Sequence, residues 1–82
     1  MINKVIKELF KRRWTSDLSD APIEKQRAQI YKTLDDQRRG LWSGHTAYHL
    51  VIDGGFLKDA KSGVNKELTA IGKEFMLEME DK

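Results

Sequence analysis

The chain has 82 residues, of which 39% are hydrophobic and 34% are charged, and its formal net charge is +2. A chain of this length has room for one hydrophobic core, so we expect a single domain over residues 1–82. The sequence contains no cysteine, which excludes a disulfide framework and thiolate metal sites, and it contains no apolar run long enough to span a bilayer. We therefore expect a small soluble protein of the cytoplasm.

Two helices are predicted in the first half of the chain. The first, over residues 2–13, carries apolar residues at steps of three and four, namely Ile2, Val5, Ile6, Leu9 and Phe10. The second, over about residues 21–38, has Pro22 in its first turn and ends at Gly40. Its expected inner side carries Ile23, Arg27, Ile30, Tyr31 and Leu34. We expect the lysines and arginines of the first helix to lie on a solvated face.

The second half is predicted to hold two further helices and a hairpin. Ser43 is expected to cap a third helix of about ten residues that stops at Gly54-Gly55, after a buried Leu41-Trp42 connection. Residues 56–68 are predicted to form two short extended pieces joined at residues 61–63. Thr69 is expected to cap a last helix whose inner stripe is formed by Ile71, Phe75 and Met79.

Two local patterns resemble those of a known family. The stretch TAYHLVIDGGFL, residues 46–57, is similar to the reading helix and first wing strand of winged helix-turn-helix proteins. The stretch LTAIGKEFM, residues 68–76, is similar to the pattern that closes their wing and opens their last helix. Over about residues 20–79 the chain resembles this family, above all its small stand-alone prophage and bacterial proteins of the YjcQ type.

The resemblance implies an α+β, mostly helical fold with three helices, a two-stranded wing and a C-terminal helix. It also implies a DNA-binding protein that acts in transcriptional control, encoded by a phage or prophage. The third helix would enter the major groove with four polar or aromatic side chains, those of Ser43, His45, Tyr48 and His49. Five cations around it would hold the phosphates: Arg38, Arg39, Lys58, Lys61 and Lys66.

The composition of the third helix weakens the prediction of sequence-specific DNA binding. Between residues 43 and 53 the sequence has no Arg, Lys, Asn or Gln, the side chains that most often read base edges. The alternative is a protein-interaction module that modulates a partner without touching DNA. The first and last helices carry more apolar residues than a small core needs, namely Phe10, Trp14, Phe75, Met76, Leu77 and Met79. If some of these are exposed, they would form a homodimer contact or a docking surface for another protein.

No cofactor, metal site or catalytic site is expected. His45, His49 and Asp53 share one helical face at metal-ligand spacing, but the chain has no third histidine and no cysteine to complete a site. The adjacent Asp35 and Asp36 point in different directions on a helix, so they are poorly placed to share a substrate. We therefore predict that the protein is not an enzyme.

Overall fold

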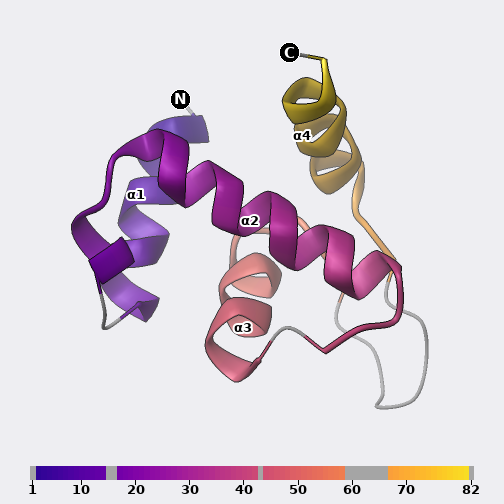
Figure 1. Ribbon diagram of the computed structural model, residues 1–82, viewed down its shortest axis with the longest axis horizontal. Helices are drawn as coiled ribbons and strands as arrows, with labels where there is room; N and C mark the ends of the chain where they lie inside the picture. The colour runs from indigo at the N-terminus through magenta and orange to yellow at the C-terminus, as the bar shows by residue number, and fades with distance from the viewer. Residues whose placement is uncertain (1, 15–16, 43, 59–66, 82) are drawn as a thin grey trace.

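The computed structural model describes residues 2–14, 17–42, 44–58 and 67–81. Within these ranges the elements are α1 (Ile2–Arg13), the 3-10 turn η1 (Asp17–Asp20), α2 (Ile23–Arg38), α3 (His45–Asp53) and α4 (Ala70–Glu80). In Figure 1, α2 crosses the middle of the molecule, and α1, α3 and α4 all pack against it. None of the described helices is long and apolar enough to cross a membrane.

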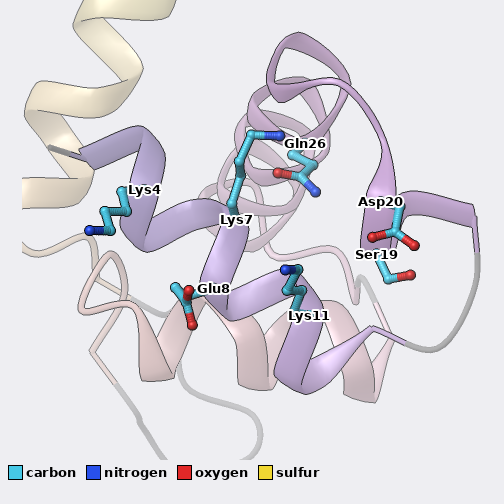
Figure 2. Close-up of a pocket in the computed structure, with 7 residues that line it drawn as sticks. All are labelled: Lys4, Lys7, Glu8, Lys11, Ser19, Asp20 and Gln26. Carbon is cyan, nitrogen blue, oxygen red and sulfur yellow. The ribbon is translucent and has the colours of Figure 1, made fainter.

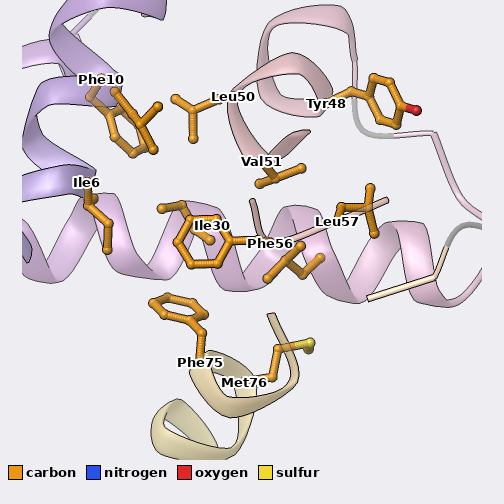
Figure 3. Close-up of a cluster of buried hydrophobic side chains, with 12 residues drawn as sticks. Ile6, Phe10, Ile30, Tyr48, Leu50, Val51, Phe56, Leu57, Phe75 and Met76 are labelled. Atoms are coloured by element: carbon orange, nitrogen blue, oxygen red, sulfur yellow. The ribbon is translucent and has the colours of Figure 1, made fainter. Parts of the chain in front are cut away.

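The described helices meet in one hydrophobic core (Figure 3). The ring of Phe56 lies near its centre and meets the ring of Phe75 edge to face, with 5.3 Å between centroids. Around this pair lie buried side chains from every α-helix, including Ile6, Leu9, Phe10, Ile30, Leu34, Leu50, Val51 and Met76. The i, i+3 and i+4 spacing of the apolar residues in α1 is what aims them at this core.

Glycine residues end α2 and α3 in the same way, as the sequence predicts. Gly40 adopts a positive φ of 79°, its N–H bonds to the carbonyl of Gln37, and the N–H of Leu41 bonds to the carbonyl of Asp36 at 2.7 Å. This is the Schellman arrangement, in which two otherwise unpaired carbonyls at the helix end are satisfied. Gly55, with φ of 78°, ends α3 by the equivalent pair of bonds. The path of the chain out of each helix is thereby fixed.

The starts of α2 and α3 lie later in the chain than predicted. Helix α2 begins at Ile23 instead of residue 21, because the preceding residues form η1 and Pro22 takes the cap position with extended backbone. Helix α3 begins at His45 after Gly44, whose φ of 95° is incompatible with a right-handed helix. Ser43, the predicted cap, lies outside the described residues.

The prediction of an α+β winged helix is wrong. The described residues form helices and no strand; a single antiparallel bridge joins Leu57 to Leu68. Phe56 and Leu57 are both buried, whereas successive side chains of a wing strand point to opposite faces and one of them should meet solvent. A two-stranded ribbon without a third strand is also only marginally stable. The predicted turn at residues 61–63 lies outside the described residues.

The predicted start of the last helix is confirmed. Thr69 caps α4 by accepting a hydrogen bond from the N–H of Gly72 at 3.0 Å. Gly72 lies so close to the backbone of Phe56 that an added Cβ would stand 2.0 Å from the Phe56 carbonyl oxygen. The glycine therefore allows α4 to dock against the chain that follows α3.

Several apolar residues are not where the sequence analysis placed them. Leu41 and Trp42, predicted as buried, are 49% and 58% exposed, and Ile71 of the predicted inner stripe of α4 is 51% exposed. Met76 takes the place of Ile71 in the core. Of the six residues suspected of forming an excess apolar surface, Phe10, Phe75 and Met76 are buried and Leu77 is 65% exposed. The exposed apolar area is therefore divided among the α2–α3 connection, α1 and α4.

Candidate functional site

The connection from α2 to α3 presents an unusual pair of side chains to solvent. Leu41 and Trp42 are both about half exposed or more, and His45 and His49 follow on the open side of α3. We call these four residues, Leu41, Trp42, His45 and His49, the α3 surface. A large exposed tryptophan next to an exposed leucine is uncommon on a monomer surface, because burying such side chains is favourable.

The indole of Trp42 is held in place although it is exposed. Its centroid lies 5.2 Å from that of Tyr48, in a tilted contact, and 5.5 Å from that of His45, in an edge contact. The His45 and His49 rings are stacked at 5.9 Å with an angle of 11° between their planes. Tyr48 is only 6% exposed, so it anchors this ring cluster to the core. The α3 surface is thus a supported aromatic patch, with little side-chain entropy left to lose when it is covered.

The arginines at the end of α2 share one carboxylate. Asp35 accepts hydrogen bonds from Arg38 at 2.6 Å and from Arg39 at 3.4 Å. The contact with Arg38 is the main cause that lowers the pKa of Asp35, and Asp35 in turn raises the pKa of Arg38. With Asp36 next in the sequence, two positive charges are matched by two negative ones. The end of α2 is therefore close to neutral.

The nine residues predicted to contact DNA do not form one exposed basic surface in the described part of the chain. Ser43, Lys61 and Lys66 lie outside the described residues. His45 and His49 are exposed together on α3, but Tyr48 is buried and unavailable to a groove. Arg38 and Arg39 are bound to Asp35, and Lys58 forms an ion pair of 3.7 Å with Glu67. Each described cation of the set thus has a carboxylate beside it, which opposes the approach of a phosphate.

Within the part of the chain that the structure describes, no third metal ligand lies beside the histidine pair. Asp53, the third member of the predicted stripe, forms an ion pair with Arg13 at the end of α1. Among the described residues no group of three or more His, Cys, Asp and Glu side chains is placed to hold a metal ion. Asp53 therefore ties α3 to α1 in this structure.

The structural role of Arg27 was not predicted from the sequence. Arg27 is 7% exposed and donates hydrogen bonds to Glu78 at 2.7 Å and to Asn3 at 2.6 Å, while its guanidinium lies 4.9 Å from the centre of the Phe75 ring. It links α1, α2 and α4; its place on the inner side of the second helix was predicted, but these contacts with α1 and α4 were not. An arginine at a core position of a helix is itself a signal of a buried polar contact.

Comparison with known proteins gives no family for this chain. No protein-family model matches it, and no curated protein or solved structure matches it significantly. The α3 surface and the charges around it are therefore the features that indicate a function.

Proposed function

We propose that this protein is a small protein-binding module that docks a partner on the α3 surface. The proposal is based on the exposure of Trp42: the residue is 58% exposed although its ring lies against Tyr48 and His45. Tryptophan is among the residues most enriched at the energetic centres of protein interfaces, where it fills a pocket of the partner. A supported indole pays less entropy on docking than a mobile one.

The charges next to the α3 surface favour a protein over duplex DNA. Nucleic-acid binding depends on cations that neutralise phosphates, and the described cations near α3 already lie beside carboxylates. A partner protein needs an apolar pocket for Trp42 and one carboxylate that can share Arg39, whose side chain is 62% exposed. The expected partner segment is therefore apolar with an acidic residue beside the apolar contact.

The other functional expectations stay predictions. A DNA-binding role in transcriptional control is the alternative function, and a phage origin, a cytoplasmic location and the lack of enzymatic activity are expectations from the sequence. The two binding functions differ in the residues they need. A protein partner needs Trp42, whereas duplex DNA needs Arg38 and Arg39 and depends steeply on salt.

A peptide display library selected on the immobilised protein tests the proposal. We expect selected peptides to combine apolar and acidic residues, and their affinity to fall by about 30-fold or more in the Trp42→Ala variant, as for an interface anchor. Ile71→Ala is the matched control, because Ile71 is 51% exposed on another helix and its loss is expected to leave the affinity unchanged. Selected peptides that bind both variants equally well would contradict the proposal.

A titration of duplex DNA provides the opposing outcome. Non-specific electrostatic binders are most easily detected at about 50 mM salt. Binding there that is lost in the double variant Arg38→Ala, Arg39→Ala and retained in Trp42→Ala would establish the alternative function instead. We expect the wild-type protein to show no DNA binding that depends on α3 or on these two arginines.

A further inference from the structure

Helices α1 and α4 carry matching stripes of opposite charge. On α1, the lysines occupy positions i, i+3 and i+7: Lys4, Lys7 and Lys11. On α4, the same spacing relates Glu74, Leu77 and Asp81, the last of which is the C-cap residue of the helix. Residues at this spacing lie on one side of a helix, and each stripe spans about 10 Å along its axis. We call them the α1 stripe and the α4 stripe.

The charges of both stripes are unpaired within the described part of the chain. Lys4, Lys7 and Lys11 form no ion pair with another described residue, and neither do Glu74 and Asp81. All five are exposed. This sets them apart from Arg38, Arg39 and Lys58, each of which lies beside a carboxylate.

The α1 stripe borders a hollow and the α4 stripe carries an apolar knob. The three lysines line a pocket of about 260 Å³ together with Gln26, Ser19 and two carboxylates, those of Glu8 and Asp20 (Figure 2). Leu77, in the middle of the α4 stripe, is the most exposed large apolar residue among those the structure describes, at 65%. On the wall of the hollow three lysines outnumber two carboxylates, and the aliphatic stems of the lysines can contact a leucine that is itself flanked by carboxylates.

The helices that carry the two stripes come together at one end of each. Helix α1 begins and α4 ends on the same side of α2 (Figure 1), and Arg27 reaches both Asn3 and Glu78 there. Two contacts between two copies, α1 stripe to α4 stripe and the reverse, are equivalent under a two-fold axis. In such a dimer all four stripes are covered, so no stripe remains free to bind a third copy.

We propose that two copies of this chain form a two-fold dimer in which the α1 stripe of each copy packs on the α4 stripe of the other. The dimer buries two copies of Leu77 and pairs Lys4 and Lys11 with Glu74 and Asp81. Exposed ion pairs contribute little each, so the dimer is weak, with a dissociation constant of about 10–100 μM at low salt, and it weakens as salt rises. It leaves the α3 surface free, and it does not depend on the function proposed for that surface.

Charge reversal on each stripe tests the dimer by sedimentation equilibrium. One variant carries Lys4→Glu and Lys11→Glu, and the other carries Glu74→Lys and Asp81→Lys. Each variant alone brings like charges together at both contacts and should weaken dimerisation by about 100-fold or more. An equimolar mixture has opposite charges at both contacts again and should dimerise within about tenfold of the wild type, since the stripes act together.

A matched control and circular dichroism separate this effect from net charge and folding. Lys25 and Lys32 are exposed on α2 at the same i, i+7 spacing, so Lys25→Glu with Lys32→Glu should dimerise like the wild type. All variants should keep the helical spectrum because the changed side chains are exposed and unpaired in the described structure. A wild type that stays monomeric at about 1 mM, far above the expected constant, would overturn the proposal. So would a mixture of the two reversed variants that stays monomeric, or a wild type that is monomeric and binds duplex DNA through Lys4 and Lys11.

Discussion

Trp42 packs on Tyr48 with 5.2 Å between ring centroids, yet the two residues differ sharply in exposure, 58% against 6%. Tyr48 belongs to the core cluster, while Trp42 lies over it and faces solvent. The two residues therefore have different roles, Tyr48 in stability and Trp42 in binding. Tyr48 supports the position of the indole, and the indole offers an apolar face to a partner.

The first prediction concerns the separate contributions of these two rings to stability. Trp42→Ala should lower the free energy of unfolding by only about 1 kcal/mol, because more than half of the residue stays exposed to water in the folded chain. Tyr48→Ala should cost about 3 kcal/mol or more, because it leaves a cavity in the core. Urea denaturation measures both values. A loss from Trp42→Ala as large as that from Tyr48→Ala would show that Trp42 is a core residue.

The second prediction concerns Arg27. Arg27→Ala should lower the free energy of unfolding by about 2 kcal/mol, because it removes charge-assisted hydrogen bonds to Glu78 and Asn3 and the contact with the Phe75 ring. Glu78→Gln should cost less than about 1 kcal/mol, because the Glu78 side chain is 61% exposed and water takes over much of its contact. Equal losses in chemical denaturation would indicate that the ion pair alone, and not the burial of Arg27, determines the effect.

The third prediction concerns the glycine where α4 docks. Gly72→Ala should destabilise the fold by about 2–3 kcal/mol, since the new Cβ would stand 2.0 Å from a backbone oxygen of Phe56 that has no flexible side chain to move. Gly55→Ala is the comparison: it meets no atom within 4 Å and should cost about 1–2 kcal/mol, from its φ of 78° alone. Thermal unfolding of both variants measures the difference. A Gly72→Ala protein as stable as the wild type would contradict the observed approach of α4.

These contacts also explain which parts of the fold could be predicted from sequence. The stops at Gly40 and Gly54-Gly55 and the cap at Thr69 depend on residues a few positions apart, so local chemistry identifies them. The wing was predicted from a Ser-Gly turn and a family-like order of elements, neither of which reports that Phe56 and Leu57 are both buried. Burial of two successive residues depends on α4 and α2, which contact them from distant parts of the sequence.

The candidate site was predictable only in part. The exposed histidines of α3 follow from helical spacing once the core edge at Leu50 and Val51 is known. The exposure of Trp42 does not, because hydrophobicity alone favours burial and the direction of the α2–α3 connection is set by the Schellman bonds at Gly40. The pairing of Arg38 and Arg39 with the Asp35 carboxylate could have been predicted, because these residues lie three and four positions after Asp35 on a predicted helix.

The fourth prediction concerns pH. The hydroxyl of Tyr31 donates to Glu80 at 2.7 Å, and this hydrogen bond is the main cause that raises the pKa of Tyr31 above its usual value of 10.0. Because the folded pKa is the higher one, the contact stabilises the fold below pH 10.0 and is lost as the pH rises through the raised value. Absorbance titration of phenolate should show this high step, and Glu80→Ala, which removes the acceptor, should move it back toward the usual value. An unchanged titration in Glu80→Ala would exclude the hydrogen bond as the cause.

The most direct test of the central claim is an NMR titration that follows the indole N–H signals of the two tryptophans. The added probe is a peptide selected on the protein, and Trp14, which lies at 5.3 Å from Phe10 near the end of α1, serves as the internal reference. The account predicts that the Trp42 signal and the backbone signals of residues 41–49 shift on binding while the Trp14 signal stays in place. Shifts confined to α1 or α4, with the Trp42 signal unchanged, would contradict the assignment of the α3 surface as the docking site.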